Sequence, residues 1–242
     1  MARTAPPKLL SADIYEAVRS DILSGRREPG SRIRIAAVAE QFKASLSVVR
    51  EALTRLAENG LVIAEPNLGF RVIPLSLEDL ADLTRVRVHV EGLAIFEAVQ
   101  RGSVTWEASV ISAHHVLIRT PMVAADDPDR VLEPWATAHA AFHSSLMEGC
   151  GSPRLIGLAQ PLRDAAEVYR RWSVPFAVGR SRDIEEEHRR ILDAVLSRDA
   201  AGARDLLVGH IEETTRVLAA TQSAEPAAAA TPKRVRAKAS GS

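Results

Sequence analysis

Four of the seven histidines in this 242-residue sequence are spaced so that they could share one metal ion. His139 and His143 are four positions apart, which places them on one face of a helix. His188 and His210 fall on two later helical segments, whose facing sides a helical hairpin could bring together. Neutral imidazoles bind Zn²⁺, and also Ni²⁺ and Cu²⁺. The pattern predicts a divalent metal site, with zinc as the preferred ion and nickel as an alternative.

Other interpretations of these histidines are simpler. Two histidines one turn apart can be an ordinary surface or core pair, and we treat His89, His114 and His115 as ordinary. The site could also perform metal-assisted hydrolysis, with Glu187 beside His188 as the base. Four protein ligands close a tetrahedral shell, however, whereas a catalytic zinc keeps one position open. We therefore expect no enzyme, and a purely structural metal remains an alternative.

The segment that carries these histidines has an almost purely helical pattern. From residue 76 to about residue 221, apolar residues recur at helical spacing with almost no strand signal. Pro134 lies near the start of the third helix, where proline is tolerated. The sequence predicts an antiparallel all-helical bundle over residues 76–221. Its helices are expected over residues 77–101, 104–119, 127–149, 153–172, 181–197 and 200–220.

The first 75 residues follow a different plan. Apolar residues at helical spacing begin behind Ser11, which we expect to cap the first helix. Two shorter helical patterns and two β-rich runs around a turn complete the segment. The fold class is therefore mainly α, with a winged helix-turn-helix over residues 8–75. Its later helices are expected over residues 35–42 and 47–58, and its strands near residues 61–63 and 70–73.

A helix-turn-helix with a wing is a common way to bind DNA. A helix fits the major groove, and a hairpin reaches the flanking backbone. The candidate recognition helix offers Ser45, Ser47 and Arg50 at its start, whose hydroxyls and guanidinium suit phosphates or guanine. Arg50 could instead pair with Glu51 or Glu58, and the whole module could serve only protein contacts.

The charge of the chain is unevenly distributed. Its 31 basic and 31 acidic residues cancel, which by itself argues against a nucleic-acid-binding protein. Residues 1–76 hold 11 basic and 8 acidic residues, residues 77–226 hold 16 and 23, and residues 227–242 hold 4 and 0. The net charges are +3, −7 and +4, so the basic N-terminal segment fits DNA binding. The Ala/Pro-rich basic tail, residues 222–242, is expected to be disordered.

Residues 8–76 resemble the winged-helix domain of the GntR family of transcriptional regulators. The resemblance rests on Pro29 to Ile33, Val38 to Phe42, Ser45 to Leu53 (SLSVVREAL), Arg55 to Val62, and Asn67 to Val72. Leu46 stands where the family commonly has an arginine, and Ala36 stands where it often has a basic residue. The candidate DNA contacts are Lys43, Ser45, Ser47, Arg50, Arg55, Asn67, Gly69 and Arg71.

The helical segment resembles the FCD-type ligand-binding domain of the FadR branch of the same family. The resemblance rests on Arg87 to Glu91, His139 to His143, Glu187-His188 and His210. That domain commonly holds a metal with one aspartate and three histidines, which match His139, His143, His188 and His210. The usual aspartate is His139 here. Losing this carboxylate should favour softer ions over Mn²⁺ or Mg²⁺ and attract an anionic ligand more strongly.

The resemblance also implies a small carboxylate effector that completes the metal shell. Arg87 is the candidate second anchor, because a guanidinium can hold a carboxylate with two hydrogen bonds. It could equally pair with Glu91, one helical turn away. We expect a homodimer on a palindromic operator, acting as a repressor, in which effector binding changes the pose of the DNA-binding domains.

The remaining features indicate a cytoplasmic protein without a membrane contact. No stretch reaches about 18 consecutive apolar residues, and the N-terminus lacks the apolar segment of a signal peptide. Cys150 is the only cysteine, so an internal disulfide and a CxxC metal knuckle are excluded.

Overall fold

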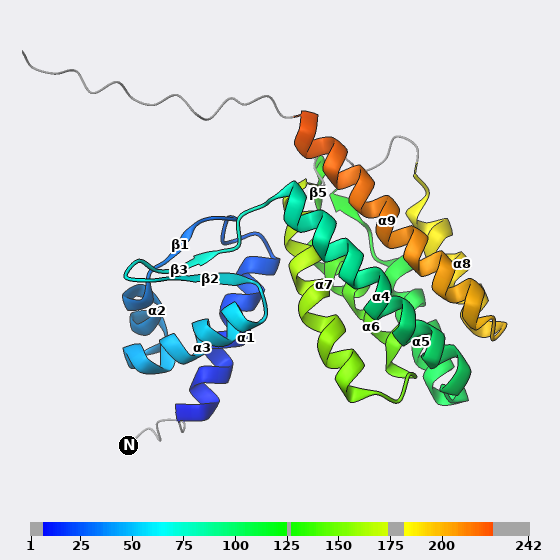
Figure 1. The fold of residues 1–242 in the computed structure, drawn as a ribbon, viewed down its shortest axis with the longest axis horizontal. Coiled ribbons are helices and arrows are strands. Elements are labelled where there is room, and N and C mark those ends of the chain that lie inside the picture. The colour runs from blue at the N-terminus through cyan, green and yellow to red at the C-terminus, as the bar shows by residue number, and fades with distance from the viewer. Residues whose placement is uncertain (1–6, 125–126, 174–181, 225–242) are drawn as a thin grey trace, which may run out of the picture.

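The computed structural model describes residues 7–124, 127–173 and 182–224, and these residues are mainly helical, as predicted (Figure 1). An N-terminal part, from α1 to β3, stands beside a C-terminal part, from α4 to α9. Most of the predicted basic tail, residues 225–242, lies outside the described residues. No helix within the described ranges is long and apolar enough to cross a membrane.

The N-terminal part packs three helices against a small antiparallel sheet. Its strands lie in the order β1-β3-β2, and the β2–β3 hairpin forms the wing. The short strand β1 is an addition to the predicted two-stranded wing, and two residues are too few to produce a strand pattern. The elements are α1 (Pro7–Leu23), β1 (Arg32–Ile33), α2 (Ile35–Phe42), α3 (Leu46–Glu58), β2 (Val62–Glu65) and β3 (Gly69–Val72).

Ser11 does not cap the first helix, which corrects the sequence-based expectation. α1 begins at Pro7, and proline is favourable in the first turn of a helix. Ser11 is fully buried inside α1, where its hydroxyl donates to the Glu51 carboxylate of α3 at 3.1 Å. The start of α3 is capped by Ser45, whose hydroxyl accepts from the Val48 N–H. The polar group of Ser11 therefore joins two helices instead of ending one.

The C-terminal part is a bundle of six described helices. α4 and α9 run side by side over most of their length, and α8 lies against α9 (Figure 1). The apolar core contains Phe142, Ile95, Ile191 and Leu207, all fully buried. The helices are α4 (Leu77–Arg101), α5 (Val104–Arg119), α6 (Glu133–Glu148), α7 (Pro153–Ser173), α8 (Ile184–Leu196) and α9 (Ala200–Ala224).

One predicted helix begins in the wrong place. Instead of a helix from residue 127, the chain forms a small hairpin of β4 (Val123–Ala124) and β5 (Asp127–Val131), and α6 begins only at Glu133. Pro128 provides the physical reason, because a proline lacks an N–H and disfavours helical backbone in the residue before it. Pro134 occupies the first turn of α6, as expected.

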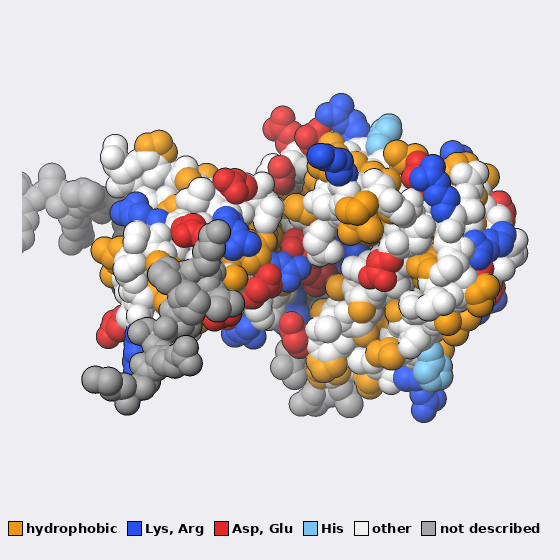
Figure 2. Space-filling view, turned by 90° about the horizontal axis from the view of Figure 1, so that it is seen from below, with side chains coloured by type: hydrophobic (Ala, Val, Ile, Leu, Met, Phe, Trp, Pro, Cys, Tyr) orange, Lys and Arg blue, Asp and Glu red, His pale blue; other side chains and the backbone are white. Residues whose placement is uncertain are grey.

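α7 belongs to both parts of the molecule. Val168 is fully buried in the apolar core of the N-terminal part, and Trp172 packs against the same core. Arg171 donates to the Ser24 carbonyl oxygen, just beyond the end of α1, at 2.7 Å. Figure 2 shows the two parts as separate lobes, with acidic and basic side chains gathered at their boundary. A shift of α7 would therefore be felt in the N-terminal part.

Trp106 joins α5 to α6, the helix that carries two of the histidines. Its indole N–H donates to the Ser145 carbonyl oxygen at 2.7 Å. The ring lies so close to Gly149 that a Cβ built there would be 2.7 Å from a ring carbon. Only glycine fits this position without moving the indole.

We predict that Gly149→Ala lowers the free energy of unfolding by about 1–3 kcal/mol, because the methyl group must displace the Trp106 ring. Gly157→Ala is the matched control, since a Cβ at this position in α7 meets no atom within 4 Å. It should be neutral or stabilising by up to about 1 kcal/mol through helix propensity. Urea unfolding followed by circular dichroism compares the two. Equal stability of both variants would contradict the described packing.

Candidate metal and ligand site

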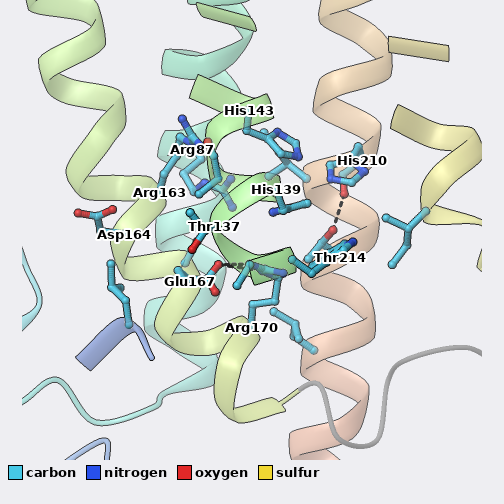
Figure 3. A pocket seen from close by; sticks show the side chains of 18 of the residues that line it. Arg87, Thr137, His139, His143, Arg163, Asp164, Glu167, Arg170, His210 and Thr214 are labelled. Carbon is cyan, nitrogen blue, oxygen red and sulfur yellow. Dashed lines mark hydrogen bonds and ion pairs between the residues drawn. The ribbon is translucent and has the colours of Figure 1, made fainter. Parts of the chain in front are cut away.

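The structure brings the four predicted histidines together. His139 and His143 come from α6, His188 from α8 and His210 from α9, and Figure 3 shows three of these rings facing one region. One ligand nitrogen from each lies within 4.8 Å of the others, and Nε2 of His143 is 3.3 Å from Nε2 of His188. Nitrogens placed tetrahedrally at zinc-bond distance are about 3.3–3.4 Å apart. The four side chains therefore fit a divalent ion.

Aromatic packing orients these rings. The fully buried Phe142 precedes His143 on α6 and contacts His143 and His188 edge-on, with ring centroids 5.5 and 5.2 Å away. Trp135 stacks on His139 with centroids 4.8 Å apart. Since packed rings cannot turn freely, the imidazoles are held facing one point.

All four imidazoles are neutral at physiological pH. Burial is the largest cause, and it lowers the pKa of every one of them; for His139 and His143 the pKa falls well below its ordinary value. Neighbouring imidazoles and arginines lower these pKa values further, and only Glu187 opposes the shift in His188 and His210. A neutral imidazole has the lone pair that a metal ion needs.

Glu187 and Arg182, which lie outside the histidine cluster, orient His210. Its Nδ1 lies 2.7 Å from a Glu187 carboxylate oxygen, and the guanidinium of Arg182 forks onto the same carboxylate at 2.6 and 2.7 Å. With Nδ1–H donated to Glu187, Nε2 of His210 is left for an ion. Burial would raise the pKa of Glu187, but the bonds from Arg182 and His210 bring it to about 2. A carboxylate engaged in this way is a poor general base.

A cavity of about 320 Å³ adjoins the histidine cluster. This volume is at the lower end of the range for small-molecule sites. Its wall includes His139, His143 and His210. Its charged lining residues are Arg19, Arg87, Arg163, Arg170, Arg182, Glu133, Asp164 and Glu167. Each of these arginines pairs with a carboxylate, and for three of them that carboxylate belongs to Glu91 or Glu187, which do not line the cavity.

Arg87 forms the predicted pair with Glu91 and also lies in the cavity wall, while its role as an effector anchor stays a prediction. Its Nε contacts the Glu91 carboxylate at 2.7 Å, and its side chain also lines the cavity. Among the described residues, the two terminal amino groups of Arg87 have no hydrogen-bond partner. Glu91 is only 1% exposed and is shared with Arg163, 3.9 Å away. The ion pair thus fixes Arg87 while part of its guanidinium remains available to a ligand.

Arg163 of α7 is a site residue that sequence reasoning missed. It is buried, and it donates to the Ser144 hydroxyl at 2.8 Å and to the Ala140 carbonyl oxygen at 2.6 Å. These bonds attach α7 to the turns of α6 that carry His139 and His143. No spacing signal distinguishes this arginine from the others on α7, and only its burial reveals its role.

The candidate DNA contacts on α3 are exposed. Ser47 and Arg50 lie on the outer face of the helix, opposite the buried Val49 and Leu53. Within the part of the chain that the structure describes, Arg50 forms no ion pair with its acidic neighbours, so the alternative with Glu51 or Glu58 is not observed. The guanidinium of Arg50 is thus available to an external partner.

The other candidate DNA contacts are more varied. The Arg55 guanidinium lies over the Tyr15 ring of α1, 4.6 Å from its centroid, and Arg71 contacts the Glu65 carboxylate at 2.7 Å within the wing. Both arginines therefore also have a role within the protein. Of the remaining candidates, Lys43 follows the end of α2, Asn67 lies in the turn of the wing and Gly69 begins β3, with φ values of 49°, 61° and 92°.

Arg32 and Arg34 were not singled out from the sequence. Both are exposed, and they line a hollow beside Leu68 and Gly69 at the tip of the wing. The alternating run Arg-Ile-Arg-Ile was the available signal, because alternate residues of an extended chain point to the same side. Arg32 and Arg34 thus place two positive charges beside the wing, whereas the first residue of α3 is the uncharged Leu46.

Comparison with known proteins identifies both parts. Residues 10–72 match the family described as bacterial regulatory proteins, gntR family, and residues 82–213 match the FCD domain. The chain is 34% identical over 204 residues to the uncharacterized HTH-type transcriptional regulator BphR of Paraburkholderia xenovorans, covering 84% of this chain and 83% of that one. It is 31% identical over 207 residues to the HTH-type transcriptional repressor GlaR of Escherichia coli, covering 84% and 93%.

Solved structures share the fold. Escherichia coli McbR/YncC superposes with a TM-score of 0.73 at 20% identity, covering 88% of this chain and 98% of that one. A putative GntR transcriptional regulator from a Rhodococcus species superposes with a TM-score of 0.70 at 22% identity, covering 89% and 99%.

The geometry of the histidine cluster predicts that the protein binds one zinc ion per chain. His143→Ala and His188→Ala should each lose this ion, because either change removes a nitrogen from the closest pair of the cluster. His115→Ala, an exposed histidine of α5, is the control and should keep it. Atomic emission after dialysis against zinc and then buffer measures the content. Equal zinc in all three variants would show that the ion is held elsewhere.

Proposed function

Because the chain belongs to the GntR family of bacterial transcriptional regulators and carries an FCD domain, we propose that it is a repressor controlled by a small carboxylate effector bound at a metal ion. The chain is a transcriptional regulator and not an enzyme, like its relatives. The cavity beside the four neutral imidazoles, lined by arginines, carries the effector proposal. Its DNA target implies a cytoplasmic location.

The proposed DNA surface is the start of α3 together with the wing. Ser45 and Ser47 present hydroxyls at the helix N-terminus, where backbone N–H groups also favour phosphate. Arg50 projects from the outer face of α3 with no acidic partner among the described residues, so it can fork onto a phosphate or a guanine. Lys43 and the wing residues Asn67, Gly69 and Arg71 are proposed to reach the flanking backbone.

The proposed active form is a homodimer on a palindromic operator. Two winged helices related by a two-fold axis match two half-sites whose spacing is about 34–36 Å or a multiple of it. Because α7 is shared by the core of the N-terminal part and the wall of the cavity, a ligand can change the pose of the DNA-binding residues. A change of pose weakens the match to the half-site spacing.

The proposed metal site is His139, His143, His188 and His210, with zinc as the preferred ion and nickel as the alternative. A bound divalent ion supplies a positive charge that attracts a carboxylate. The histidines hold the ion, Glu187 orients His210, and the free amino groups of Arg87 receive a second oxygen of the effector. All four proposed ligands are neutral imidazoles, so they leave the full positive charge of the ion to attract the carboxylate.

A purely structural metal is the second candidate. Four protein ligands can close a tetrahedral shell, and such a shell needs no effector. The neighbouring cavity favours the regulatory function, because a structural site has no need of a charged chamber of about 320 Å³. Metal-dependent hydrolysis is disfavoured, since Glu187 is already bonded to Arg182 and His210.

We predict that carboxylates stabilise the zinc-loaded protein and not the His143→Ala variant. A ligand at 100 times its Kd adds about 2.7 kcal/mol to the free energy of unfolding, which raises Tm by several degrees. A thermal-shift screen of lactate, dicarboxylates and sugar acids measures this effect. No stabilisation by any acid would favour the structural metal. Equal stabilisation of the His143→Ala variant would show that the acid binds independently of the metal.

We predict that Arg50→Ala weakens DNA binding by about 1–3 kcal/mol, or roughly 5- to 150-fold, if Arg50 contacts a base. The probe is a duplex that the wild-type protein selects from a random pool, and binding is followed by fluorescence anisotropy. Arg154→Ala removes an equal charge from the exposed start of α7 and serves as the control. Equal affinities of the two variants would show that Arg50 does not contact the DNA.

A further inference from the structure

The wall of the cavity is not built by the C-terminal part alone. Arg19, Ser20 and Leu23, all from α1 of the N-terminal part, line the same cavity as His139 and His143. A ligand large enough to fill the cavity would therefore touch the part of the protein that carries the proposed DNA surface. Figure 3 shows Asp164, the partner of Arg19, on the opposite side of the view from His210.

Arg19 is held in the wall by a two-pronged ion pair. Its Nε and one terminal nitrogen each lie 2.6 Å from an oxygen of Asp164, and the Gln160 amide also donates to this carboxylate at 2.9 Å. The other terminal nitrogen of Arg19 is 3.7 Å from Glu16, too far for a hydrogen bond. The Arg19 side chain is 26% exposed, so this nitrogen can donate a hydrogen bond to a further anion.

The ion pair links the cavity to the recognition helix. Within the N-terminal part, α1 is bonded to α3 through Ser11 and Glu51, and Asn59 donates to the Tyr15 hydroxyl at 2.6 Å. A displacement of Arg19 from Asp164 would therefore be passed through α1 to α3.

We propose that Arg19 binds the far end of the effector, and that the effector is an acid with a second anionic group. This inference rests on the proposed function, which assigns the first carboxylate to the metal and Arg87. Arg87 and Arg19 line the cavity from different helices, and each has at least one guanidinium nitrogen without a hydrogen-bond partner among the described residues, so the wall offers two separate places for an anionic group. Arg19 comes from α1, whereas the histidines come from helices of the C-terminal part. A ligand that contacts both therefore needs an anionic group at each end.

A second anion at the free terminal nitrogen of Arg19 shares the positive charge of this guanidinium with Asp164. The Asp164 carboxylate holds α1 against α7. A ligand that takes part of this guanidinium weakens that hold, so the DNA-binding residues are released from one fixed pose. The DNA-binding part would thus recognise the effector directly, in addition to any motion passed through α7.

The test compares matched acids on the zinc-loaded full-length protein. Straight-chain monocarboxylic acids of two to eight carbons and the α,ω-dicarboxylic acids of equal length are titrated by isothermal calorimetry. For at least one length, the wild-type protein should bind the diacid about tenfold more tightly than the monoacid. Arg19→Gln should remove this difference and leave monoacid affinity and zinc content unchanged.

Two further variants keep the test decisive. Arg27→Gln is the matched control, because Arg27 also pairs with an aspartate in the N-terminal part, is similarly exposed at 23%, and does not line the cavity. It should retain the preference for the diacid. Arg19→Gln leaves the Asp164 carboxylate without its cation, which could disturb the fold. The double variant Arg19→Gln, Asp164→Asn removes both charges and avoids this. It should keep its fold and lose the diacid preference, as Arg19→Gln does.

The outcomes separate this inference from the proposed function. If acids bind the wild-type protein and Arg19→Gln retains the diacid preference, Arg19 is only a structural ion-pair residue and the inference is wrong, while the proposed function stands. The same holds if no diacid exceeds its monoacid. If no acid of either series binds the zinc-loaded protein, both the inference and the proposed carboxylate effector are overturned.

Discussion

Four imidazole rings gathered at one point, three of them buried, are the constraint on which the C-terminal part depends. Burial keeps the rings neutral, so each retains the lone pair that a metal ion needs, and the closest two ring nitrogens, of His143 and His188, lie 3.3 Å apart. Three helices must therefore meet at a fixed distance. Phe142, Trp135 and the Glu187–Arg182 pair hold the rings in this arrangement, and Arg163 attaches α7 beside them.

α7 connects this centre to the rest of the molecule. One face of the helix lines the cavity with Gln160, Arg163 and Asp164, and another buries Val168 in the core of the N-terminal part. A rigid helix that belongs to two cores cannot move in one without disturbing the other. Among the described residues, the cavity is thus joined to the N-terminal part by packing, by the Arg19–Asp164 ion pair and by the hydrogen bond from Arg171 to Ser24.

Much of this could be predicted from the sequence. The bounds of α4 and α5 and the i, i+4 pair on α6 follow from local patterns, which depend on residues near one another in the chain. Ser11 and the start of α6 could not be placed in this way. Ser11 bonds to Glu51 on another helix, and Pro128 diverts into a hairpin a segment that otherwise has a helical composition.

The sequence by itself determined the family, the two kinds of domain and the identity of the four histidines, because each rests on residue types at characteristic spacings. Only the tertiary structure decided that these histidines meet, that Arg87 pairs with Glu91 while still lining the cavity, and that Arg19 of α1 reaches the same chamber. The physical reason is that burial and long-range pairing depend on how helices pack. Packing joins residues such as Arg19 and Asp164, which no local pattern relates.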